Sequence, residues 1–249
     1  MSHHLVEARS LMYAYPDGNQ ALNGVSFRIE HGESVAIIGG NGAGKSTLLL
    51  HLNGLLKPAA GSVRVGDLPL VSETLPQIRR TIGMLFQDPD DQLFMANVYD
   101  DVAFGPANMG LPPDEIDVRV RASLDIVGAG HLAMRPPYQL SGGEKRAVAI
   151  AGVLAMSPSI LVMDEPSSGL DPAARRRLIN LLRGFSHTKI IATHDLDLVL
   201  DLCSRVLVMH EGRIEADGRA EEIFADAELL ARCQLELPLS RQPRTAPPL

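Results

Sequence analysis

The sequence predicts an α/β fold built on a parallel sheet, with a small antiparallel sheet before it and a helical insert within it. Three observations predict this fold class. Short apolar runs, the pattern of strands that are buried on both faces, alternate with helical segments along most of the chain. Residues 5–29 instead alternate apolar and polar side chains around a turn. Residues 98–135 are helical in character, with a break expected at Pro112-Pro113.

The composition is that of a globular protein with one sizeable core. The 249 residues are 45% apolar and 21% charged, and α/β folds of this length form around a single core. The longest nearly unbroken apolar stretch, Ala147–Met156, is far shorter than the ~20 residues of a membrane-spanning helix. The amino terminus lacks the pattern of a signal peptide. We therefore expect any role at a membrane to depend on a membrane partner.

Charge and cysteine content exclude two classes of protein. The net charge is −7 and the longest Lys/Arg run is Arg175–Arg177, so a sequence-independent grip on nucleic acid is not expected. Cys203 and Cys233 form no C-x-x-C pair, and we expect two reduced thiols rather than a disulfide or a zinc site. His3 and His4 near the amino terminus are assigned no role.

The first elements are short strands. Alternation over Leu5–Tyr15 and Val25–Ile29, split by the turn residues Pro16–Asn19, predicts the antiparallel sheet. Further strands are predicted at Gly61–Val65 and Ile82–Phe86.

A glycine-rich loop follows the apolar run Val35–Ile38. Residues 39–47 read GGNGAGKST and match the phosphate-binding pattern G-x-x-x-x-G-K-[ST] between a predicted strand and helix. Glycines let backbone N–H groups converge on phosphate oxygens, and the helix dipole favours an anion there. Lys45 supplies a mobile positive charge, and the hydroxyls of Ser46 and Thr47 serve Mg²⁺ and phosphate. The predicted nucleotide-binding residues of the loop are Gly39, Gly40, Asn41, Gly42, Ala43, Gly44, Lys45, Ser46 and Thr47.

The string LSGGEKR at 140–146 introduces another strand and helix alternation. A helix is predicted over Lys145–Met156. The apolar run Ser159–Met163 predicts a buried parallel strand with two acids, Asp164 and Glu165, at its carboxyl end.

The last predicted elements begin at Asp171. This residue fits a helix N-cap with proline at the first helical position, ahead of a helix to Phe185. A strand, Ile190–Ala192, ends just before His194. Residues 236–249 are rich in proline and poor in apolar anchors, which predicts a disordered tail.

Six motifs in one fixed order resemble those of the ATP-binding-cassette (ABC) ATPases over about residues 5–235. They are the phosphate loop, Gln87 after a strand, LSGGE, an apolar strand that ends in Asp164-Glu165, Ser168–Asp171 and Thr193–Asp195. The resemblance implies a P-loop NTPase core with a helical signature subdomain inserted at about 90–156, and hydrolysis of ATP with Mg²⁺. The chain departs from the family pattern at Gly40 and in SGLD for the commoner SALD, and neither change removes a chemical group.

The resemblance also assigns roles to single residues. Asp164, with Ser46 and Gln87, would hold Mg²⁺, and Glu165 would be the general base that polarises the attacking water. His194 would contact the γ-phosphate. The predicted catalytic residues are Glu165, His194, Lys45 and Gln87.

Tyr15 resembles the aromatic residue that stacks on adenine. It lies thirty positions before Lys45, at a strand end where a ring can face a ligand. Tyr13 is the alternative, because an aromatic residue on an edge strand often serves packing alone.

In this family the LSGGE motif acts on ATP that is bound by a partner. Ser141, Gly142 and Gly143, followed by Glu144, open a helix, and their donors would form a second anion cradle. The resemblance implies a head-to-tail homodimer with two shared ATP sites, and Asp171 would lie at the interface between the two copies.

Longer strings narrow the resemblance to energy-coupling-factor (ECF) importers, especially the cobalt and nickel branch. These are FQDPDDQLF at 86–94, VYDDVAFGP at 98–106 and LSGGEKRAVAIAGVLAM at 140–156. The partners implied are an integral coupling subunit and a metal-binding membrane subunit, with the ATPase peripheral on the cytoplasmic face of the membrane. Importers of a vitamin or another solute are the alternative, and a soluble ABC ATPase outside transport is a further one.

Asp88, Asp90 and Asp91 lie beside Gln87. These acidic side chains suit a binding site for basic coupling helices of a membrane partner. A solvated turn has the same composition, and the sequence favours neither interpretation.

Overall fold

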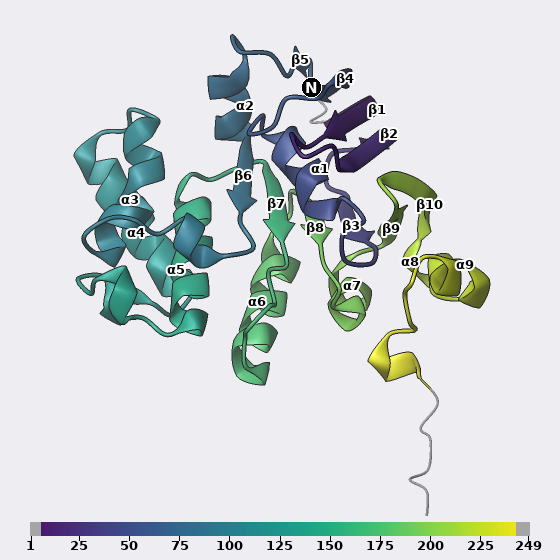
Figure 1. Ribbon diagram of the computed structural model, residues 1–249. Helices are drawn as coiled ribbons and strands as arrows, with labels where there is room; N and C mark the ends of the chain where they lie inside the picture. The colour runs from purple at the N-terminus through teal and green to yellow at the C-terminus, as the bar shows by residue number, and fades with distance from the viewer. Residues whose placement is uncertain (1–5, 243–249) are drawn as a thin grey trace, which may run out of the picture.

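The chain folds around a six-stranded sheet. A computed structural model describes residues 6–242, so His3 and His4 lie outside the described residues. The strands of this sheet are β3 (Ser34–Ile38), β6 (Ile82–Leu85), β7 (Ile160–Asp164), β8 (Thr188–Ala192), β9 (Arg205–His210) and β10 (Arg213–Arg219). Their order is β10-β9-β3-β8-β7-β6, and only the β9–β10 pair is antiparallel within the described residues (Figure 1). The predicted parallel sheet is confirmed.

A second sheet is antiparallel throughout the described residues. It consists of β1 (Val6–Ala14), β2 (Gln20–Ile29), β4 (Ala60–Val65) and β5 (Leu68–Pro69). The order is β2-β1-β4-β5, so β1 pairs with β2 on one side and with β4 on the other. The predicted antiparallel pair of strands is confirmed, and the strand predicted at Gly61–Val65 joins this sheet.

Helices pack on both faces of the six-stranded sheet. They are α1 (Lys45–Leu52), α2 (Leu75–Thr81), α6 (Pro172–Gly184), α7 (Leu196–Leu202), α8 (Ala220–Ile223) and α9 (Ala227–Arg232). Val35 and Ile37 of β3 face one core, which holds α1 and the antiparallel sheet. Ala36 and Ile38 face a second core, with α6 to α9. The alternation along a strand thus supplies both cores.

A separate group of helices forms the predicted insert, beside the sheet in Figure 1. It contains α3 (Val98–Asn108), α4 (Pro113–Ile126) and α5 (Gly142–Ala155), with the short 3₁₀ helices η1 (Pro89–Asp91), η2 (Gly130–Leu132) and η3 (Pro137–Gln139). These helices have an apolar cluster of their own. Pro113 is the first residue of α4, so the break expected at Pro112-Pro113 is confirmed.

Helix α5 begins three residues before the predicted start at Lys145. Ser141 is its N-cap, and a reciprocal pair of hydrogen bonds with Glu144 closes a capping box. The capping box favours the helix more than Gly142 and Gly143 disfavour it.

The disordered tail expected from residue 236 is wrong for the part that is described. A 3₁₀ helix, η4 (Leu239–Arg241), follows Pro238. The Ser240 amide donates to the carboxylate of Asp197 on α7 at 3.3 Å, and the Gln242 amide group donates to the Leu237 carbonyl at 2.9 Å. Contacts with a distant helix order this segment despite its composition. Residues 243–249 lie outside the described range.

Both cysteines are buried and unpaired. Burial raises the pKa of the Cys203 thiol to about 12, so it stays protonated near neutral pH. No helix in the described part of the chain is long and apolar enough to cross a membrane.

Candidate functional site

The phosphate loop lies between the end of β3 and the start of α1. Gly42 and Gly44 have φ angles of 77° and 98°, in the left-handed region that favours glycine. A Cβ on Gly39 would overlap the Met209 carbonyl, and one on Gly44 would overlap the Ala21 carbonyl. The glycines therefore let the loop fit against neighbouring backbone, without side chains that would cover its N–H groups.

The Lys45 ammonium group lies over this loop. Its Nζ donates to the Gly39 carbonyl at 2.8 Å and to the Gly40 carbonyl at 3.1 Å. Burial lowers the pKa of Lys45, while the nearby carboxylates of Glu165 and Asp164 act in the opposite direction. The structure thus brings the predicted cation to the mouth of the loop.

Asp164 ends strand β7 next to the loop. Its carboxyl group is buried, which raises its pKa, and a hydrogen bond from the Ser46 hydroxyl opposes that rise. Oδ1 has no hydrogen-bond partner among the described residues. A buried carboxylate oxygen without a partner, next to a hydroxyl, fits a hard divalent cation such as Mg²⁺. Asp164 and Ser46 therefore both suit such an ion.

Glu165 has a strained backbone and a fixed side chain. Its φ is 45°, an uncommon conformation for a residue with a Cβ. Oε2 accepts hydrogen bonds from Thr193 Oγ1 at 3.0 Å and from the His194 amide at 3.2 Å. The carboxylate is buried, whereas the side chain of His194 is 71% exposed, with Nδ1 2.8 Å from the same oxygen.

Strand pairing explains why these two predicted residues meet. Asp164 of β7 pairs with Ala192 of β8, and the Glu165 amide donates to the Ala192 carbonyl at 2.8 Å. The carboxyl ends of neighbouring parallel strands lie at one edge of the sheet. The acid that follows β7 is therefore brought beside the histidine that follows β8.

Gln87 is held through its backbone. The guanidinium group of Arg146 donates to the Phe86 carbonyl at 2.8 Å and to the Gln87 carbonyl at 2.5 Å. Arg146 is buried on α5, while the Gln87 side chain is exposed. Arg146 thus ties helix α5 to the segment that follows β6. Sequence reasoning missed this contact, although Arg146 is the last residue of LSGGEKR.

Tyr15 lies against helix α1. Its hydroxyl is 3.0 Å from Thr47 Oγ1. Tyr13 contacts His51 instead, with ring centroids 4.8 Å apart. Of the two candidates, Tyr15 is the one hydrogen-bonded to a residue of the predicted nucleotide site.

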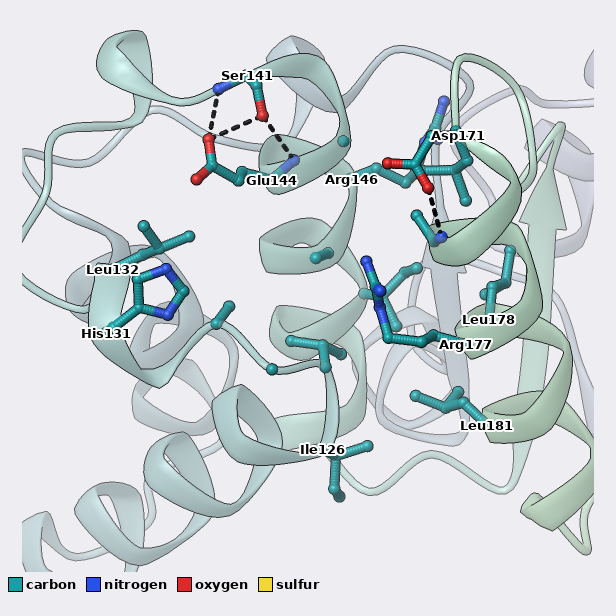
Figure 2. A pocket seen from close by; sticks show the side chains of 18 residues that line it. Ile126, His131, Leu132, Ser141, Glu144, Arg146, Asp171, Arg177, Leu178 and Leu181 are labelled. Carbon is teal, nitrogen blue, oxygen red and sulfur yellow. Dashed lines mark hydrogen bonds between the residues drawn. The ribbon is translucent and has the colours of Figure 1, made fainter.

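The LSGGE residues form a second, separate feature, drawn in Figure 2. The Ser141 amide and hydroxyl each donate to Glu144 Oε2 at 2.8 Å, and these bonds lower the pKa of Glu144. Gly142 and Gly143 form the first turn of α5, where amides have no acceptor within the helix. This turn borders a cavity of about 260 Å³ between α5, α6 and residues 126–132, which no phosphate-loop residue lines. The predicted second anion site therefore borders a different cavity from the phosphate loop.

Asp171 borders the same cavity (Figure 2). Its side chain accepts a hydrogen bond from the Ala174 amide at 2.7 Å, which confirms the predicted N-cap of α6. Asp195, which follows the next strand, β8, accepts hydrogen bonds of 2.7 and 2.9 Å from the Arg175 guanidinium group, and sequence reasoning missed this pair.

The side chains of two of the three clustered aspartates, Asp88 and Asp90, contact other groups of the described chain. Asp88 caps η1 by accepting from the Asp90 amide at 2.9 Å. Asp90 pairs with Lys145 of α5 at 2.6 Å. The cluster is therefore built into the junction between η1 and α5, and it is not only a solvated turn.

Comparisons with known proteins agree with this geometry. The ABC transporter family profile matches residues 22–168. A putative ABC transporter ATP-binding protein of Geobacter sulfurreducens is 64% identical over 97% of this chain and 97% of its own length. The energy-coupling factor transporter ATP-binding protein EcfA of Methanothermobacter thermautotrophicus is 50% identical over 94% of this chain and 77% of that protein. The structure of cbiO1 from Clostridium perfringens, part of the ABC transporter complex cbiONQ, matches 95% of this chain and 96% of that one, with a TM-score of 0.78 and 45% identity.

Proposed function

Since the chain belongs to the ABC transporter family, we propose that it is the ATPase subunit of an ECF importer whose cargo is cobalt or nickel. As a member of this family it binds ATP, and it couples ATP hydrolysis to transport. The likeness to EcfA and to cbiO1, together with the string FQDPDDQLF, supports the ECF assignment. The chain would act on the cytoplasmic face of the membrane.

The phosphate loop is proposed to hold the triphosphate. Loop amides, Lys45 Nζ and the Thr47 hydroxyl would donate to phosphate oxygens, and Tyr15 would stack on adenine. Ser46, Asp164 and Gln87 would hold Mg²⁺, which supplies charge neutralisation on the phosphates when bound. The unpartnered Oδ1 of Asp164 supports this assignment for Asp164.

Glu165 is proposed as the general base. Its Oε2 is fixed by Thr193 and His194, which orients the carboxylate beside the loop. A carboxylate there can accept a proton from water as the water attacks the γ-phosphorus. His194, largely exposed and next to Glu165, would contact the γ-phosphate.

A second copy of the chain is the proposed partner for the LSGGE motif. The first turn of α5, with Ser141 as its cap, would close over ATP bound to the other copy, and Asp171 would lie at the seam. This turn borders a cavity that no residue of the phosphate loop lines, which supports an arrangement in which two copies share two sites.

We expect Ser141→Arg to leave ATP binding to a single chain nearly unchanged but to block dimer closure. The long side chain would occupy the place of the partner's phosphate, and hydrolysis should fall about 10²-fold, the loss typical when one donor to a reacting anion is removed. Light scattering measures dimer closure, and the steady-state rate measures ATP hydrolysis. Ser72→Arg, on an exposed turn, is the matched control. Normal hydrolysis by Ser141→Arg would remove the shared-site proposal.

The surface around η1 is the proposed contact with a membrane coupling subunit. Asp91 is exposed there, and the exposed rings of Phe94 and Phe104 pack edge to face with centroids 4.9 Å apart. Acidic and aromatic groups side by side suit a helix with basic and apolar side chains. Asp90 is paired with Lys145 and Asp88 caps η1, so Asp91 is the aspartate of the cluster best able to make such a contact.

Uptake of radioactive cobalt and nickel by cells with and without this chain tests the cargo. We expect deletion to reduce uptake of one of the two ions to the background of passive entry, and the intact chain, but not Glu165→Gln, to restore it. Unchanged metal uptake with a loss of vitamin uptake would replace the metal proposal with the vitamin alternative. Metal enters through the membrane subunits in this proposal, so the chain itself need not bind it.

A further inference from the structure

A histidine outside the predicted site takes part in a closed series of contacts between helix α1 and the end of strand β1. His51 lies near the end of α1 and its side chain is fully buried. Its Nδ1 is 2.7 Å from the Thr47 carbonyl, one turn earlier on the same helix. Because a carbonyl only accepts, Nδ1 carries the proton and donates. The imidazole is thereby fixed to the backbone of a phosphate-loop residue.

The other nitrogen of the ring does not anchor it. Nε2 has no hydrogen-bond partner of normal geometry among the described residues, although the Lys57 backbone lies close by. A buried polar atom without a partner costs stability and has to be offset by other contacts of the ring. An apolar side chain would avoid this cost, so packing in the core alone does not explain a histidine here.

The imidazole of His51 contacts Tyr13, and Tyr13 in turn contacts Tyr15. The imidazole centroid is 4.8 Å from that of Tyr13, with an interplanar angle of 73°. Tyr13 in turn lies 5.1 Å from Tyr15, at 84°. Both are edge-to-face arrangements, which aromatic rings prefer and which restrict the orientation of each ring. Tyr13 is the penultimate residue of β1, and Tyr15 directly follows its last residue, Ala14.

Tyr15 completes this closed series of contacts. Its hydroxyl is 3.0 Å from Thr47 Oγ1, so contacts run from the Thr47 carbonyl through His51, Tyr13 and Tyr15 back to the Thr47 hydroxyl. The circuit joins two elements that are distant in sequence, the end of β1 and the start of α1. It holds Tyr15, the ring proposed to stack on adenine, in one position relative to α1, the helix proposed to bind the phosphates.

We infer that His51 is a positioning residue for nucleotide binding, acting through Tyr13 to place Tyr15 for adenine relative to the phosphate loop. The inference rests on the proposed role of Tyr15. Without the imidazole ring, Tyr13 loses its support and Tyr15 has to be ordered when the base binds. Affinity for a ligand with a base should then fall, while affinity for phosphates alone should not.

The test compares MgADP with magnesium pyrophosphate, each titrated into the full chain by calorimetry. His51→Asn retains a donor for the Thr47 carbonyl but has no aromatic ring, and His51→Phe retains the ring without the donor. We expect His51→Asn to weaken MgADP binding about three- to tenfold, the range measured for one aromatic pair. Pyrophosphate affinity should change less than about twofold. His51→Phe should bind MgADP nearly as the unmodified chain does.

Steady-state kinetics add a second readout. His51→Asn should raise the KM for ATP by a similar factor and leave kcat at saturating ATP nearly unchanged, because the reacting groups are not touched. Tyr13→Leu should reproduce the effect of His51→Asn, and it carries the test if the His51 variants do not fold. Thermal unfolding checks the folding of each variant.

Combination with Tyr15→Leu separates this inference from the proposed function. If His51 acts through Tyr15, then His51→Asn adds little to the loss already caused by Tyr15→Leu. If Tyr15→Leu weakens MgADP but His51→Asn does not, the positioning role is wrong and the role of Tyr15 stands. Equal weakening of MgADP and pyrophosphate by His51→Asn would show that His51 only supports the fold of the loop. If Tyr15→Leu has no effect, the adenine assignment fails and the inference fails with it.

Discussion

Glu165→Gln is expected to bind ATP with nearly normal affinity and to hydrolyse it about 10²- to 10⁴-fold more slowly, the contribution typical of a general base. The amide keeps an oxygen that can accept from Thr193 and from the His194 amide, so the local structure should survive. It cannot take a proton from water at neutral pH. With the chemical step slowed, the ATP-bound dimer should accumulate and be visible by light scattering.

Glu73→Gln is the control for the loss of one carboxylate, because Glu73 is exposed on a turn and is not among the predicted site residues. Its hydrolysis rate should equal that of the unmodified chain. Full hydrolysis by Glu165→Gln would assign the base to another group. A slow variant that stays monomeric with ATP would keep the base assignment and contradict ATP-driven dimer closure.

Lys45→Ala is expected to weaken MgATP binding about 10- to 100-fold, the range for loss of a hydrogen bond to a charged group. The Nζ already lies at the mouth of the loop, so its positive charge requires little rearrangement to meet a phosphate. The lowered pKa of Lys45, caused by burial, should return toward its usual value when the phosphates provide new negative charge. Hydrolysis should fall with binding.

Lys57→Ala, which removes an exposed lysine just after the same helix, is the matched control. Calorimetry with MgADP and MgATP on both variants separates the loss of one phosphate contact from a general loss of positive charge. Unchanged affinity in Lys45→Ala would contradict the assignment of the phosphate loop.

Local signals predicted much of the fold. The turn at Pro16–Asn19, the helix break at Pro112-Pro113 and the N-cap at Asp171 each depend on neighbouring residues, and each is confirmed. The tail after residue 236 is different, because its order depends on Asp197, some forty positions earlier in the chain. A composition rich in proline describes local preference and gives no information about such a contact.

The candidate site divides in the same way. Residues 39–47 and the Asp164-Glu165 pair could be assigned from sequence because the chemistry of phosphate and metal binding requires particular side chains at short, fixed spacing. Their meeting with other parts of the chain could not. Arg146 reaches the Gln87 carbonyl from a helix almost sixty positions later, and Thr193 reaches Glu165 through the pairing of β7 with β8.

Residue types and short spacing thus determined that this chain is an ATP-binding protein and predicted where the phosphates would lie, because those properties depend on a few adjacent backbone and side-chain groups. The tertiary structure decided which side chains hold these groups in place. Contacts such as His51 with Tyr13, or Tyr15 with Thr47, depend on how a strand end lies against a helix. That relation is set by the packing of the whole core, to which many distant residues contribute small amounts.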